Sequence, residues 1–373
     1  MKYKLKKFTL SEISVGNKGN YGISASAIEF SNDLPTYLRI SDISDDGTLN
    51  KNKMMSIDDD NASKYILKKD DIVFARTGGS TGRNYFHDSE EEYIYAGFLI
   101  KFSIDKKKVN PKYIKYYCQS KEYYNWIYSF KSGSTRGNIN AKTLGELPIF
   151  LPERIIQNKT VEILRYLDKK IELNNKINDN LEQQAQAIFK SWFNNSEPNG
   201  KLKDIILENP KSKIKVGDVK KNNGQYPFFT SGQSILSYSF PLVNGRNCFL
   251  NTGGNADVKF YIGKASYSTD TWCIFAKNKL TDYLFLLLLS IKNEINDQYF
   301  EGSALKHLQK KSLKNKEIYI PFDNEIIEFN KLIIPVFDNI INNKIQNKKL
   351  SLLRDSLLPK LMSGEIDVSN IAI

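Results

Sequence analysis

The sequence is poor in the side chains from which many catalytic and metal sites are built. In 373 residues it has three cysteines, Cys118, Cys248 and Cys273, and two histidines, His87 and His307. An odd number of widely separated cysteines predicts neither a disulfide framework nor a zinc site. A lone histidine is more often a surface or core residue than a catalyst. We therefore expect no metal and no catalytic residue on this chain.

Long apolar runs are missing as well. The longest run, residues 283–291, is too short to cross a bilayer and predicts a buried helix or strand. The first seven residues lack the apolar segment of a signal peptide. We therefore expect a cytoplasmic protein with no membrane contact.

Acidic residues are outnumbered by basic ones. The chain has 54 Lys and Arg against 42 Asp and Glu, a formal charge of +12. A basic surface gains free energy by neutralising phosphates and releasing counterions, which favours a polyanionic partner, although a membrane surface would also attract it. The length exceeds what one hydrophobic core usually holds, so the sequence predicts two domains.

One stretch of the sequence occurs twice. Residues 133–192 return without a gap as residues 302–361, an offset of 169 (302 − 133 = 169), beginning with Gly133-Ser134 and Gly302-Ser303. In the second part of each copy, nine positions recur at heptad spacing, and eight of them are apolar or Asn in both copies. These positions are Leu164, Leu167, Ile171, Asn174, Asn178, Leu181, Ala185, Ile188 and Trp192 in the first copy and Ile333, Val336, Ile340, Asn343, Asn347, Leu350, Arg354, Leu357 and Leu361 in the second. The match predicts a shared helical seam, the alternative being that two Lys-, Asn- and Ile-rich helices look alike by composition.

The repeat divides the chain into two globular and two helical segments. We expect globular regions at 1–152 and 201–321, and long helices at 153–194 and 322–363. Residues 153–193 contain no proline or glycine, whereas Pro335 should kink or restart the second helix and Gly364 should end it. Strands are predicted at 36–40 and 71–75. The globular regions share little beyond turn positions.

These segments predict an α+β fold with a pseudo-two-fold repeat. The two helices would pack antiparallel in the manner of a coiled coil, with the Asn positions fixing their register. The alternative is that each helix folds back on its own domain.

Catalytic motifs are weak. Residues 78–83 are rich in glycine but lack the lysine and spacing of a phosphate-binding loop, so they predict a turn. Asp218/Lys220 and Asp257/Lys259 resemble half of a metal-dependent nuclease site, which leaves a DNA-cleaving enzyme as one alternative. An assembly scaffold whose charge is incidental is another.

Nucleic-acid recognition accounts for more of the sequence. Arginine can pair with guanine edges, amides suit adenine, and hydroxyls and lysine commonly hold phosphates. The predicted DNA-binding residues are Arg39, Ser41, Arg76, Thr77, Gly78 and Arg83 in the first globular region and Thr230, Ser231, Asn251, Thr252, Asn255 and Lys306 in the second. In the alignment of the two regions, residues 251–254 correspond to residues 76–79.

The order of these motifs resembles the specificity subunits of type I restriction–modification systems. The resemblance rests on residues 37–43, 71–78, 133–134, 147–152 and 167–171, and on the closing Lys360-Leu361-Met362-Ser363-Gly364-Glu365-Ile366. It implies two target-recognition domains, each reading half of a bipartite sequence, and antiparallel helices that act as a ruler and dock two methylation subunits.

The resemblance also implies that the chemistry belongs to partner subunits. Methylation subunits would bring S-adenosylmethionine, and a restriction–translocase subunit would use ATP and magnesium, with no cofactor on this chain. The second region lacks the arginine of the Arg76-Thr77-Gly78 segment. A repeated frame that carries unlike globular regions predicts a non-palindromic site.

Overall fold

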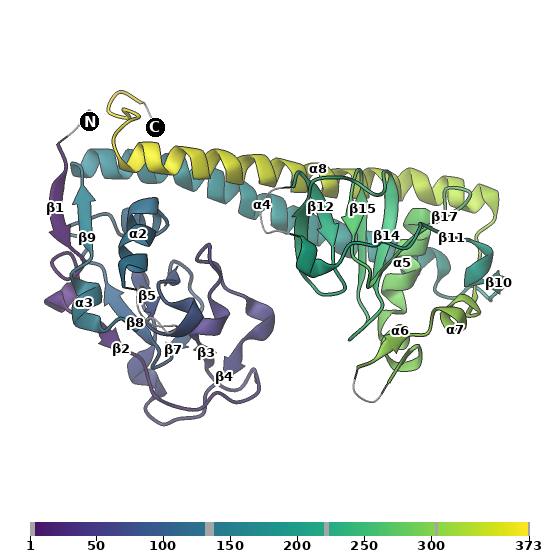
Figure 1. Ribbon diagram of the computed structural model, residues 1–373, viewed down its shortest axis with the longest axis horizontal. Coiled ribbons are helices and arrows are strands. Elements are labelled where there is room, and N and C mark those ends of the chain that lie inside the picture. The colour runs from purple at the N-terminus through teal and green to yellow at the C-terminus, as the bar shows by residue number, and fades with distance from the viewer. Residues whose placement is uncertain (1–3, 131–137, 220–223, 303–304, 372–373) are drawn as a thin grey trace. The chain divides into compact units, whose positions relative to one another are not determined.

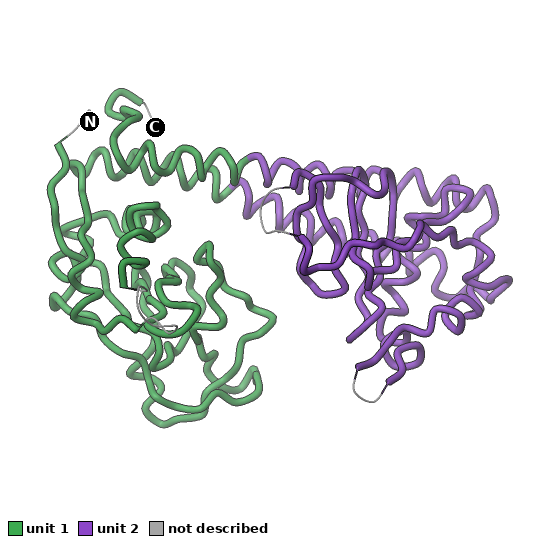
Figure 2. The backbone as a smooth tube through the Cα atoms, in the orientation of Figure 1, with its two compact units in different colours: residues 1–169, 350–373 green, residues 170–349 purple. Residues whose placement is uncertain are grey.

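The computed structural model describes residues 4–130, 138–219, 224–302 and 305–371. These residues form two compact units, one made of residues 1–169 and 350–373 and the other of residues 170–349 (Figure 2). Gly133, Ser134, Lys220 and Ser303, which the sequence analysis named, lie outside the described residues. The globular ranges 1–152 and 201–321 stay predictions, since each unit also takes in part of both long helices.

Among its described residues, the globular part of unit 1 contains a four-stranded sheet, a three-stranded sheet, a two-stranded sheet and three short α-helices (Figure 1). Its elements are β1 (Lys6–Thr9), β2 (Asn20–Tyr21), β3 (Thr36–Leu38), β4 (Met55–Ser56), β5 (Asp71–Ala75), β6 (Asn84–Phe86), β7 (Tyr93–Tyr95), β8 (Leu99–Ser103), α1 (Pro111–Tyr117), α2 (Lys121–Ser129), α3 (Ala141–Gly145) and β9 (Pro148–Leu151). All five residues of β5 are buried, as their continuous apolar pattern predicts for a central strand.

Unit 2 is built in the same way. Its elements are β10 (Gly200–Lys201), β11 (Ile206–Glu208), β12 (Tyr226–Phe229), β13 (Ile235–Tyr238), β14 (Arg246–Asn251), β15 (Val258–Ile262), β16 (Ser266–Tyr267), β17 (Thr271–Ala276), α5 (Thr281–Ser290), α6 (Lys292–Gln298), β18 (Phe300–Glu301), β19 (His307–Leu308), α7 (Lys310–Lys314) and β20 (Glu317–Ile318). The apolar run at 283–291 falls almost wholly within α5, which confirms the predicted buried helix.

The two globular regions have one strand topology. The larger sheets are ordered β2-β8-β5-β6 and β11-β17-β14-β15, and the smaller ones β4-β3-β7 and β13-β12-β16. The β3–β7 and β12–β16 pairs are both parallel, and antiparallel pairs β1–β9 and β10–β20 stand at the base of each region. The likeness therefore extends well beyond turn positions. Topology depends on the pattern of buried positions and turns, which many sequences satisfy.

The long helices repeat with the same offset. Helix α4 spans Arg154–Phe193 and α8 spans Asp323–Met362, and both ends differ by 169 (154 + 169 = 323; 193 + 169 = 362). Each end lies within one residue of the predicted helix. Gly364 follows α8 with a φ of 72°, the left-handed conformation of a helix-terminating glycine.

Pro335 does not interrupt α8, so the expected restart at this residue was wrong. A proline removes one helix hydrogen bond, here the one to the carbonyl of Lys331. Both Pro335 and Lys331 are exposed, which leaves that carbonyl accessible to water. Ile333 and Phe337 on the opposite face are buried in the core of unit 2, and their packing offsets the loss.

In each unit, part of α4 and part of α8 pack against the globular region of that unit. Leu164 of α4 and Leu361 of α8 belong to the core of unit 1, and Phe189 of α4 and Phe329 of α8 to that of unit 2. Within each unit the two half-helices also run beside each other in opposite directions (Figures 1 and 2). The predicted α+β fold with antiparallel long helices is confirmed.

Candidate nucleic-acid interface

The loop after β5 is the most constrained part of the predicted site in unit 1. The Arg76 backbone N–H donates to the Phe98 carbonyl at 3.0 Å, and the Ile139 N–H donates to the Arg76 carbonyl at 2.9 Å. Gly78 has a φ of 70°, which glycine adopts without strain, and residues 78–80 form a single helical turn. The loop thus holds Arg76 and Thr77 in a fixed position.

Arg76 keeps hydrogen-bonding capacity. Its guanidinium lies 5.1 Å from the centre of the Tyr21 ring, and its Nη2 makes a long bond of 3.4 Å to Asn138 Oδ1. Its buried Nε has no hydrogen-bond partner within the described part of the chain. A buried donor without a partner costs free energy, about 1–3 kcal/mol.

The other predicted arginines are engaged. Arg39 forms a two-pronged ion pair with the fully buried Asp42, at 3.0 Å from Nε and 2.8 Å from Nη2. The Ser41 hydroxyl donates to the same carboxylate at 3.2 Å. Arg83 is held by Asp45 at 2.7 Å and by a backbone carbonyl. These contacts fix local structure, and a role of these residues in DNA binding stays a prediction.

A cleft of about 560 Å³ brings three of the predicted residues together: Arg39, Ser41 and Arg76. Thr77, Gly78 and Arg83 do not line it. Tyr21 and Phe98 do, with 43% and 59% of their surfaces exposed. Sequence reasoning missed both aromatic residues. The available signal was that each stands beside a glycine, Gly22 and Gly97, in a strand-rich region.

The backbone pairing aligns unit 2 with unit 1 and corrects the sequence alignment by one residue. Thr252 N–H donates to the Asp270 carbonyl at 3.0 Å, and Leu308 N–H donates to the Thr252 carbonyl at 3.1 Å. These are the bonds that Arg76 makes in unit 1. Gly254, with a φ of 83°, then corresponds to Gly78. Arg76 is therefore matched by Thr252, and not by Asn251, because Asn251 still belongs to strand β14.

The predicted residues of unit 2 fall into two groups. Asn251 is buried, and its amide bonds to backbone groups of Gly253 and Asn255, so it holds the loop closed. Asn255 and Lys306 are exposed beside it, and Gly254 N–H donates to the Lys306 carbonyl at 2.9 Å. Thr252, Asn255 and Lys306 thus lie on adjoining segments.

Thr230 and Ser231 belong to a different turn. They follow β12 in the smaller sheet of unit 2. The Thr230 hydroxyl donates to the Ser234 carbonyl at 2.7 Å and stabilises that turn. Their contact with DNA stays a prediction.

One of the two Asp/Lys pairs of the nuclease alternative, Asp257 with Lys259, forms an ion pair. Asp257 contacts Lys259 at 2.8 Å and Lys292 at 3.0 Å. Burial opposes ionisation of Asp257, but hydrogen bonds and charge from these lysines hold the pKa of its carboxyl below its usual value. Among the described residues no group of three His, Cys, Asp or Glu side chains is placed to hold a metal ion.

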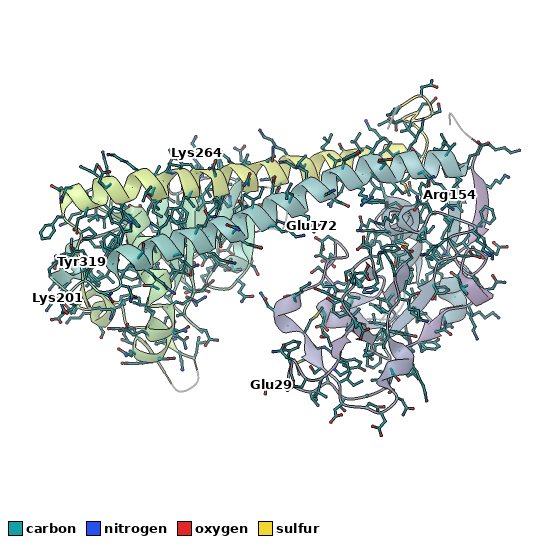
Figure 3. The ribbon with its side chains drawn as sticks, turned by 180° about the vertical axis from the view of Figure 1, so that it is seen from behind. Glu29, Arg154, Glu172, Lys201, Lys264 and Tyr319 are labelled. Carbon is teal, nitrogen blue, oxygen red and sulfur yellow. The ribbon has the colours of Figure 1, made fainter. Side chains whose placement is uncertain are left out.

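Asparagine side chains connect the two helices within unit 2. Asn174 Nδ2 donates to Asn347 Oδ1 at 2.8 Å, and Asn343 Nδ2 donates to Asn178 Oδ1 at 2.9 Å. By the 169-residue offset, Asn174 corresponds to Asn343 and Asn178 to Asn347. The bonds therefore cross between equivalent positions, as in a two-fold symmetric interface. Glu172, labelled in Figure 3, pairs with Lys176 at 2.6 Å on the exposed side of this stretch.

The remaining predicted seam residues are buried or half-buried. Three of them are buried: Leu164, Ile333 and Ile340. The others are half-buried: Leu167, Ile171, Leu181, Asn343 and Leu350. Exposed apolar residues also occur on the helices. Those on α4 are Ile155, Tyr166, Leu173, Ile177 and Trp192.

The family model for the type I restriction modification DNA specificity domain matches residues 3–183 and 197–354. The chain belongs to this family. With the repeated fold, the two matched regions make it a specificity subunit with two target-recognition domains. Among the described residues, no helix has both the length and the apolar character needed to span a bilayer.

Relatives of this specificity subunit match along most of the chain. The type I restriction enzyme MjaIX specificity subunit of Methanocaldococcus jannaschii is 26% identical over 312 residues, 72% of each chain. The HindI specificity subunit of Haemophilus influenzae is 23% identical over 407 residues, covering 82% of this chain and 88% of its own. A crystal structure of the S subunit from M. genitalium has a TM-score of 0.58 at 15% identity, covers 96% of each chain, and shows the shared fold.

Proposed function

We propose that this specificity subunit binds a bipartite, non-palindromic sequence in double-stranded DNA, with each target-recognition domain reading one half. The observation that carries the proposal is the contrast between Arg76 and Thr252. The two residues have the same backbone hydrogen bonds in the same topology but offer different chemistry. One scaffold with two unlike reading positions recognises two unlike half-sites.

The charge of the chain supports DNA as the partner. A net charge of +12 attracts the phosphate backbone irrespective of base sequence, and base contacts then select the site. The nuclease alternative has less support, because Asp257 is already paired with two lysines.

The subunit itself performs no catalysis in this proposal. It docks two methylation subunits, which carry S-adenosylmethionine and modify adenine N6, and, where the system has one, a restriction–translocase subunit that uses ATP and magnesium. The exposed apolar residues of α4 provide surface for such docking. The complex works in the cytoplasm, where its DNA substrate is found.

Methylome sequencing tests the proposal. A host without other adenine methylation is given this chain together with its methylation partner, and the partner alone serves as the control. We expect N6-methyladenine at one bipartite, non-palindromic motif, and only when both proteins are present. A motif without a gap, or methylation by the partner alone, would overturn the proposal.

A binding measurement separates the DNA-binding function from the scaffold alternative. The affinity of the assembled complex for a duplex carrying the motif should fall steeply as salt rises from about 50 to 200 mM. A scaffold would bind its protein partners with no salt-dependent affinity for DNA.

A further inference from the structure

Two positions at the ends of adjacent strands differ sharply in chemistry between the two units. In unit 1 they are Arg76 and Phe98, joined by a backbone hydrogen bond of 3.0 Å. In unit 2 the same bond, also 3.0 Å, joins Thr252 and Asp270. Unit 1 therefore presents the guanidinium of Arg76 and the ring of Phe98. Unit 2 presents a hydroxyl and a carboxylate at the same two positions.

We propose that this strand-end pair selects a base in each half-site: Arg76 reads a guanine, and Asp270 reads the amino group of a cytosine or an adenine. The inference rests on the proposed function, because it takes these loops to face the DNA. It adds Phe98 and Asp270 to the specificity-determining residues.

The surroundings of Arg76 suit a base edge. The Tyr21 ring supports its guanidinium at 5.1 Å, and among the described residues Nη2 makes one long hydrogen bond, of 3.4 Å, so the planar group is oriented while its terminal nitrogens keep donor capacity. Guanine offers two acceptors, O6 and N7, spaced for an arginine fork. Phe98, 59% exposed in the same cleft, offers an apolar surface to a neighbouring thymine methyl group.

The negative charge of Asp270 makes a contact with phosphate unfavourable. Asp270 is exposed, and within the described residues its carboxylate accepts a hydrogen bond from the Thr269 hydroxyl at 3.3 Å. A carboxylate repels phosphate, so at a DNA-facing position it fits an amino group on a base edge. Lys306, exposed on the adjoining strand segment, supplies the positive charge for the backbone.

The test uses the full chain with its methylation partner and compares Arg76→Lys with Arg76→Ala. Lysine keeps the positive charge but cannot donate the two parallel hydrogen bonds of a guanidinium. A contact with phosphate should therefore survive this change, and a contact with a guanine edge should not. We expect both variants to methylate a motif in which one guanine position of one half-site has become degenerate, with discrimination reduced about 10- to 100-fold. Lys69→Ala, in an exposed pair on the same unit, should leave the motif unchanged.

The second half of the test concerns the other half-site. Asp270→Ala should relax one position there while the first half-site stays intact, and Asp297→Asn serves as the matched exposed control. Competition binding with duplexes altered at one base pair checks the same positions. A uniform loss of affinity with every motif position retained would assign these residues to the backbone and overturn the inference.

The outcomes separate this inference from the proposed function. If the native complex methylates a bipartite motif and Arg76→Lys and Asp270→Ala change no position in it, the inference fails and the function stands. If the native complex gives no bipartite motif, the function itself fails, and with it the inference.

Discussion

Arg354 of α8 donates a hydrogen bond of 3.0 Å to Asp168 of α4 within unit 1, and the counterparts of this ion pair in unit 2 are apolar. The 169-residue offset relates Asp168 to Phe337 and Arg354 to Ala185 (168 + 169 = 337; 354 − 169 = 185), and both counterparts are buried. The Tyr116 hydroxyl also donates to Asp168, at 2.8 Å. The helix pair is thus not fully symmetric: these two positions carry an ion pair in unit 1, and their counterparts in unit 2 are apolar.

Removing Arg354 should destabilise the protein. In Arg354→Met the half-buried Asp168 keeps only its bond from Tyr116, and we expect the free energy of unfolding to fall by about 1–2 kcal/mol. The double variant Asp168→Leu/Arg354→Met should lose less than the sum of the single changes, measured by urea unfolding. Lys176→Met breaks the exposed pair with Glu172 and should cost about 0.5 kcal/mol or less. Additive single effects would argue against a coupled pair.

The asparagine bonds should favour correct pairing over maximal stability. Asn178→Leu removes the acceptor of Asn343 Nδ2 and should cost about 1–3 kcal/mol of unfolding free energy. The double variant Asn178→Leu/Asn343→Leu should be near neutral or more stable, since two apolar side chains then meet. Denaturant unfolding of the four proteins in this cycle provides the measurement. A single variant as stable as the native chain would contradict it.

The stability should depend on pH through Asp282. Burial raises the pKa of Asp282 to about 6, although Arg246, at 2.5 Å, opposes the shift. The folded state therefore binds more protons than the unfolded state between about pH 4 and pH 6. This contribution to stability is complete below about pH 4 and is lost as the pH rises through 6. In Asp282→Asn the slope across this window should become less negative, by at most about 1.4 kcal/mol per pH unit. Thermal unfolding at several pH values, with Asp297→Asn as an exposed control, checks it.

The cysteines should be unreactive in the native protein. Cys118, Cys248 and Cys273 are buried, and burial raises the pKa of each thiol. Because the thiolate is the reactive form, a thiol reagent at pH 8 should label them only after denaturant is added. Rapid labelling of any one without denaturant would contradict its burial.

The sequence predicted the helical frame more closely than the globular regions. Both long helices were placed within one residue at each end, because the heptad spacing and the terminating Gly364 are signals that act locally along the chain. Pro335 was misjudged because its effect depends on which side of the helix faces solvent. That orientation is set by tertiary packing.

The reading positions were predicted less well. Thr-Gly-Gly occurs after both central strands, but the residue that ends the strand differs, so the sequence alignment was off by one at Thr252. Tyr21 and Phe98 are lone aromatic residues without periodicity, and they converge with Arg76 only through pairing of distant strands. Contacts between distant segments leave no local pattern to read.

Each globular region is entered and left through one pair of antiparallel strands. In unit 1, Thr9 lies opposite Pro148, and in unit 2, Lys201 lies opposite Glu317. A different chain with the same two ends, and with apolar residues that pack on α4 and α8, would therefore join the same helices. Under the proposed function, such an exchange changes the loops that read the DNA and leaves the helical frame in place.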